Sequence, residues 1–122
     1  ITLGLVRHPQ LQVRTFSDER SAAFIALGMA QQTNRPVVLV CTSGSAAYNF
    51  APAIAEAFFQ QVPLIVITAD RPTEWVGQRD GQTIYQQSIY QNHVKRSYHL
   101  PEDTTHPDAR WHFFRQLNEA LD

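Results

Sequence analysis

The sequence predicts an α/β fold in which helices cover both faces of a parallel sheet, a three-layer α/β/α domain. Two continuous apolar runs support this prediction, Val37–Cys41 and Leu64–Thr68. Neither run alternates apolar with polar residues, which is typical of strands buried on both faces. The stretch between them has helical character, so the two strands should form a right-handed parallel unit. A polar turn follows each run, and ligands of parallel sheets bind beyond these strand ends.

Size and composition fit one globular domain over residues 1–122, with a formal net charge of −1. With this charge, the chain does not have the positive surface potential that favours binding to nucleic acid. No apolar run approaches the roughly 20 residues that are needed to span a bilayer. We expect no signal peptide. The only cysteine, Cys41, cannot form an internal disulfide, which favours a reducing compartment such as the cytoplasm; we expect its thiol to be buried and inert. The histidines show no ligand spacing, so no metal is assigned to the chain.

The N-terminal part predicts one short strand. Residues 1–8 fit either a strand or the first turns of a helix, and Pro9 ends that element. Leu11–Phe16 alternates apolar and polar residues, which predicts a short strand.

A buried helix is predicted next, over Ser21–Gln32, because this stretch is apolar on nearly all sides. Ser17 or Asp18 is a suitable N-cap. Gly28 weakens the helix by about 1 kcal/mol relative to alanine, so we expect it to allow close approach to a strand.

The helix that joins the two strands is predicted from about Ala46 to Gln60. Pro52 lies within it and predicts a kink or a break near Asn49.

The C-terminal third begins with a polar, glutamine-rich segment, Thr73–Asn92, a candidate substrate loop with a short helix from about Thr83. Lys95–Leu100 alternates weakly and predicts an outer strand. Pro107 opens a last helix, whose apolar residues have helical spacing.

Three candidate sites follow predicted strands. Glu19 follows a predicted strand and starts a buried helix, where a carboxylate can hold a proton near neutrality. The alternative is a solvated acid that interacts with the helix dipole.

The segment Thr42–Ser45 offers free N–H groups before a helix, which could bind an anion or a polar ring edge. The alternative is only an N-cap and a tight turn. Arg71 can clamp a carboxylate or phosphate; the alternatives are a local ion pair with Asp70 or an arginine at a helix end.

Five stretches together resemble the pyrimidine-binding domain of thiamine diphosphate-dependent enzymes. They are Asp18–Arg20, Thr42–Ala46, Pro63–Pro72, Gln82–Ile84 and Gln86. The Thr-Ala-Asp-Arg-Pro signature ending at Pro72 resembles the SEPHCHC synthases, the MenD family of menaquinone biosynthesis. The resemblance covers nearly the whole chain.

The resemblance implies a cofactor and a catalytic residue. Glu19 would be the glutamate that hydrogen-bonds the pyrimidine N1′ of thiamine diphosphate, and Thr42, Ser43 and Gly44 would contact the cofactor. A family member with this domain is a transferase that decarboxylates 2-oxoglutarate on the cofactor and adds the succinyl carbanion to isochorismate. Arg71 and Gln82 match family positions that line the substrate site.

The chain also departs from this family. Asparagine is common in the family where Gly81 stands. Of the six strands expected in the order 2-1-3-4-6-5, the first and the last have no counterpart here. The domain that binds the diphosphate through Mg²⁺ or Mn²⁺ is missing as well, so an isolated fragment should be inactive. A second subunit of a homodimer or homotetramer would supply that domain.

Two alternatives to a SEPHCHC synthase fragment stay open. One is the pyrimidine domain of another thiamine diphosphate-dependent carboligase or decarboxylase. The other is a non-catalytic α/β module that keeps this fold. Glu19 argues against the module, because a module without catalysis does not need a carboxylate there.

Overall fold

Two parallel strands, β1 (Val37–Cys41) and β2 (Leu64–Thr68), form the sheet in the computed structural model, which describes residues 1–122. Val37 lies opposite Leu64 and Cys41 opposite Thr68. Both strands have the predicted bounds, and helix α3 (Ser45–Gln60) connects them. The predicted α/β class with a parallel sheet is therefore confirmed.

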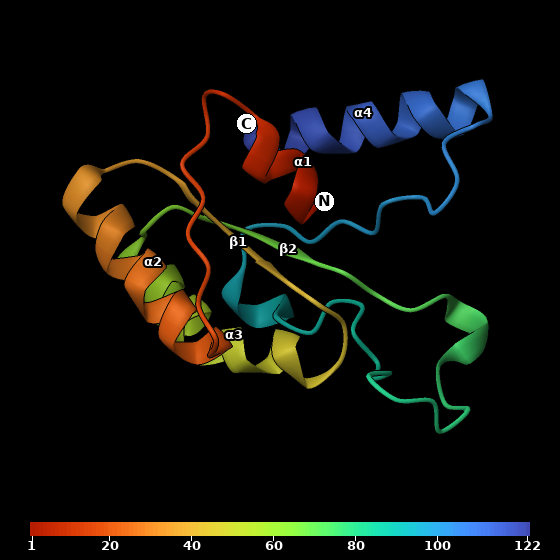
Figure 1. Cartoon of the computed structure of the whole chain (residues 1–122), viewed down its shortest axis with the longest axis horizontal. Helices are drawn as coiled ribbons and strands as arrows, with labels where there is room; N and C mark the ends of the chain where they lie inside the picture. The colour runs from red at the N-terminus through yellow and green to blue at the C-terminus, as the bar shows by residue number, and fades with distance from the viewer.

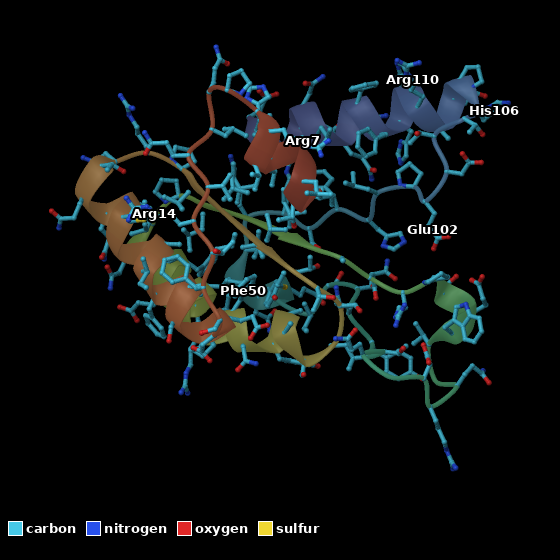
Figure 2. All side chains as sticks on the ribbon, in the orientation of Figure 1. Arg7, Arg14, Phe50, Glu102, His106 and Arg110 are labelled. Carbon is cyan, nitrogen blue, oxygen red and sulfur yellow. The ribbon has the colours of Figure 1, made fainter.

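Helices α2 (Glu19–Thr33) and α3 pack against each other on one side of the sheet (Figure 1). Phe50 is 1 % exposed and lies between these helices and the strands (Figure 2). Most other buried residues on the two helices are alanines, whose small side chains let the helices approach closely: Ala23, Ala26, Ala30, Ala46, Ala47, Ala53 and Ala57. The hydrophobic core therefore lies between one helix pair and one face of the sheet.

The other face of the sheet is only loosely covered. Helices α1 (Thr2–Arg7) and α4 (Pro107–Leu121) lie on that side in Figure 1, and neither has a buried residue. In β1, Leu39 is 6 % exposed whereas its neighbour Val38 is 45 % exposed. The three layers are present in outline, but the prediction that both faces of β1 are buried is wrong.

Two predicted outer strands do not form. Leu11–Phe16 and Lys95–Leu100 have irregular backbone, and the sheet contains only β1 and β2. A strand is stabilised by hydrogen bonds to a neighbouring strand, and neither segment makes backbone hydrogen bonds to β1 or β2. Alternation of apolar and polar residues was therefore not enough to specify a strand at these positions.

Three local predictions need smaller corrections. Helix α3 runs unbroken through Pro52, because the residues on both sides of the proline are anchored in the core. Gly28 makes no close approach, since a Cβ there would meet nothing within 4 Å. The segment from Thr83 forms turns rather than a helix, and its only helical turn is η2 (Gln91–His93).

The remaining elements agree with the sequence or settle its ambiguity. Residues 2–7 are helical, and α4 begins at Pro107 as predicted. A further 3-10 turn, η1 (Thr73–Trp75), follows β2. No helix combines the length and the apolar character that crossing a membrane requires.

Candidate functional site

Glu19 is the first residue of α2, and its position follows from the cap before it. Asp18 has extended backbone, and its carboxylate accepts a hydrogen bond from the Ser21 N–H at 2.7 Å. Hydrogen bonding with Ser21 lowers the pKa of Asp18. Because Asp18 caps the N-terminus of α2 through the Ser21 N–H, the half-buried Glu19 side chain is not needed as a cap.

The Glu19 carboxylate is close enough to the end of β1 to act on Cys41. Burial and, after it, the charge of Glu19 raise the pKa of Cys41 to about 11. Tyr90 also lies here: its hydroxyl donates to the Ala47 carbonyl, and burial followed by the charge of Cys41 raises its pKa. The start of α2, the end of β1 and the start of α3 therefore meet at one edge of the sheet.

The turn after β1 is built on Gly44. Gly44 has φ 83° and is the N-cap of α3, with no side-chain hydrogen bond in the cap. A Cβ on Gly44 would lie 2.9 Å from the Cα of Gln82, so only glycine fits this approach. The segment therefore supplies the N-cap and the tight turn of the alternative prediction, although through the backbone of Gly44 and without a hydroxyl group. Ser43 and Gly44 are buried, whereas Thr42 is exposed.

Gln86 connects this turn to the turn after β2. Its Oε1 accepts from the Gly44 N–H at 3.1 Å, and its Nε2 donates to the Ala69 carbonyl at 2.5 Å. The side chain is 6 % exposed. Gln86 belongs to the resemblance described above, but the sequence predicts no role for it, because a contact across 42 residues leaves no local signal.

Arg71 lies just beyond β2 with its side chain 44 % exposed. Its Nε is 4.0 Å from a carboxylate oxygen of Asp80, whereas Asp70 accepts a hydrogen bond from the Arg71 backbone N–H at 2.8 Å. The expected alternative, an ion pair between Arg71 and Asp70, is therefore wrong. The guanidinium faces a loop carboxylate at the outer limit of ion-pair distance, where an anionic ligand can compete for it.

A cleft of about 460 Å³ opens beside Arg71. Gln86, Gln87, Tyr85 and His99 are among the other residues that line it. The cleft therefore combines a cation with amide, hydroxyl and imidazole groups.

The predicted site residues fall into two groups. Glu19 and Thr42–Gly44 do not line the cleft beside Arg71, and neither does the side chain of Gln82. Gln82 nevertheless contacts the Gly44 turn through its backbone, which has φ 59°. The Gln86 amide is the direct link between the two groups.

The arrangement offers hydrogen-bonding groups and not a cluster of metal ligands. It offers a half-buried carboxylate and a turn without Cβ at one strand end. No group of three or more His, Cys, Asp or Glu side chains lies together in the chain.

Comparison with known proteins assigns these features to a family. Residues 1–97 match the family described as "Thiamine pyrophosphate enzyme, N-terminal TPP binding domain". The chain is 55% identical over 121 residues to a 2-succinyl-5-enolpyruvyl-6-hydroxy-3-cyclohexene-1-carboxylate synthase of Cytophaga hutchinsonii, an alignment that covers 99% of the chain. It is 49% identical over 117 residues, 96% of the chain, to the protein of the same name from Bacteroides fragilis. The chain spans only 22% and 21% of the lengths of these relatives.

Proposed function

This chain belongs to the family of thiamine pyrophosphate enzymes, as an N-terminal TPP-binding domain, and on that premise we propose that it is the pyrimidine-binding part of a longer 2-succinyl-5-enolpyruvyl-6-hydroxy-3-cyclohexene-1-carboxylate (SEPHCHC) synthase. The observation that best supports the proposal is that the charge of Glu19 acts on Cys41, the last residue of β1, directly before the turn that contains Gly44. The similarity to synthases of this name over almost the whole chain supports it independently.

The residues fit the pyrimidine half of the cofactor. Glu19 would share a proton with a nitrogen of the pyrimidine ring, and the Gly44 turn would meet the ring with its backbone. Ser43 and Thr42 would complete the contact from the same turn. When bound, thiamine diphosphate supplies the carbanion chemistry for decarboxylation and carbon–carbon bond formation, and the protein supplies orientation and proton control.

The chain does not fit the diphosphate half of the cofactor. Its acidic residues do not gather into a metal site. We therefore assign Mg²⁺ or Mn²⁺ and the diphosphate to a further domain, supplied by a second subunit of a homodimer or homotetramer. The 122-residue chain alone should show no turnover. A cytoplasmic location stays a prediction.

The substrates of the longer protein would be 2-oxoglutarate and isochorismate. Each carries two carboxylates, and Arg71 presents a guanidinium at the edge of its cleft for one of them. Gln82, whose backbone lies on the Gly44 turn, would contact substrate between that cleft and the cofactor.

A substrate panel on the intact protein tests the proposal. Loaded with thiamine diphosphate and Mg²⁺, the protein should release carbon dioxide from 2-oxoglutarate but not from pyruvate. It should also form a stable adduct only when isochorismate is present, which mass spectrometry detects. Preference for pyruvate or for another 2-oxo acid would instead support a different thiamine-dependent carboligase. The absence of turnover with every donor would support a non-catalytic module.

A further inference from the structure

The amide of Gln86 makes the only side-chain hydrogen bonds that connect the turns after β1 and β2, in addition to a backbone bond from the Ala69 N–H to the Cys41 carbonyl at 3.1 Å. It accepts from the Gly44 N–H and donates to the Ala69 carbonyl. Gly44 belongs to the turn proposed to bind the cofactor, and Ala69 lies two residues before the proposed substrate ligand Arg71. One side chain thus joins the two halves of the proposed site.

We propose that Gln86 is a positioning residue, which holds the Gly44 turn and the Ala69–Arg71 turn at a fixed separation and so aligns substrate with cofactor. This inference rests on the proposed function above and adds a residue to it.

The chemistry of the bridge requires an amide. One end must accept from an N–H and the other must donate to a carbonyl oxygen, and glutamine does both without charge. A glutamate in this buried place would keep the acceptor but would turn a carboxylate toward the Ala69 carbonyl. A methionine of similar length would leave both backbone groups without their partner.

The bridge also explains why the loop lies on the turn. The backbone of Gln82 packs against Gly44 at a distance that leaves no room for a Cβ, and four residues later Gln86 closes the contact with its amide. Loss of the amide would therefore free the loop as well as the two turns.

Three variants of the intact protein test the proposal. Gln86→Met removes both hydrogen bonds, and Gln86→Glu removes only the donor to Ala69. Gln91→Met is the matched control, because Gln91 is exposed in the same loop and its side chain makes no recorded hydrogen bond. Hydrogen exchange at Gly44 is measured by mass spectrometry without substrates, and kcat and KM are measured for the proposed reaction.

The proposal predicts a different pattern for each variant. In Gln86→Met, exchange at Gly44 accelerates about tenfold through loss of one hydrogen bond, and kcat falls by roughly 10²-fold through misalignment. In Gln86→Glu, protection of Gly44 is kept, while KM for the acidic substrates rises because the turn that bears Arg71 has lost its only hydrogen bond to Gln86 and is held only by the backbone bond from Ala69 to Cys41. Gln91→Met behaves as the unsubstituted protein.

Other outcomes overturn the proposal. An unchanged exchange rate at the Gly44 amide in Gln86→Met would show that the Gln86 side chain does not hold the Gly44 turn. The variants can also lose activity only because their melting temperature is lower. If activity returns on cooling, Gln86 has a purely structural role. If the unsubstituted protein lacks synthase activity, the proposed function fails, while exchange at Gly44 still decides whether Gln86 holds the turn.

Discussion

Arg71 illustrates how much a single side chain depends on its planar shape. Its guanidinium is half-exposed at the mouth of the cleft and only loosely paired with Asp80. We predict that Arg71→Lys in the intact protein raises KM for an acidic substrate by about 10-fold or more, because the charge stays and the two-point hydrogen bonding is lost. Steady-state kinetics and titration with thiamine diphosphate measure the two affinities separately. Weaker cofactor binding with an unaltered KM would assign Arg71 to the cofactor instead.

Cys41 gives a prediction that depends on pH. Burial and the nearby Glu19 raise its pKa from 9.0 to about 11. Since the thiolate is the reactive form, native protein should alkylate slowly at pH 8 and quickly only near pH 11. The folded state holds this proton more tightly than the unfolded state, so the resulting stability is present below pH 9 and is lost between pH 9 and 11.

Alkylation with iodoacetamide, followed by intact mass, measures this titration at a single site, since Cys41 is the only cysteine. Protein unfolded in urea is the control and should react with a midpoint near 9.0. Cys41 is half-buried, not fully buried as expected from the sequence. A native midpoint equal to that of the unfolded protein would mean that partial burial and the charge of Glu19 do not act on its thiol.

At the scale of elements, the turn at Gly44 depends on a backbone that only glycine adopts easily. Gly44→Ala places a Cβ 2.9 Å from the Gln82 backbone at φ 83°. We expect a loss of about 1–3 kcal/mol in the free energy of unfolding. Gly81→Ala is the matched control, because Gly81 has open space around it and should change stability by less than about 0.5 kcal/mol. Urea denaturation of both variants measures the difference, and equal midpoints would contradict the account of this turn.

The success of the sequence predictions differs between kinds of element. The bounds of β1 and β2 follow from two apolar runs, and the start of α2 follows from the cap at Asp18. These signals are local in the sequence, and the structure contains the elements that they predict. Leu11–Phe16 also alternates correctly, yet it forms no strand, because strand formation needs a hydrogen-bonded neighbour.

The same distinction applies to the site. The turns that follow β1 and β2 were predicted because parallel strands bring their carboxyl ends to one edge. The Gln86 bridge and the pairing of Arg71 with Asp80 were not predicted. Both depend on how the loop after β2 folds back, and glutamine-rich composition does not specify that path.

At the scale of the whole molecule, many large apolar side chains of the chain are exposed. The sheet has only two strands, one face of it is open at Val38, and Phe59 is 75 % exposed. Unpaired strand edges and large apolar patches favour association with another chain. We predict that the isolated 122-residue chain self-associates at micromolar concentration. Light scattering during size-exclusion chromatography checks this, and a single 13.9 kDa species at every concentration would contradict it.

The central claim is that Glu19, at the start of α2 and near the end of β1, shares a proton with the pyrimidine ring of the cofactor. The most direct test is the exchange of the thiamine diphosphate C2 proton in the intact protein. Glu19→Gln keeps the shape of the side chain and removes its charge, so exchange should slow by about 10²–10⁴-fold while the fold, followed by circular dichroism, stays intact. Deuterium exchange, quenched in acid and observed by nuclear magnetic resonance, measures this rate. Exchange at the rate of the unsubstituted protein would contradict the claim and remove Glu19 from the catalytic site.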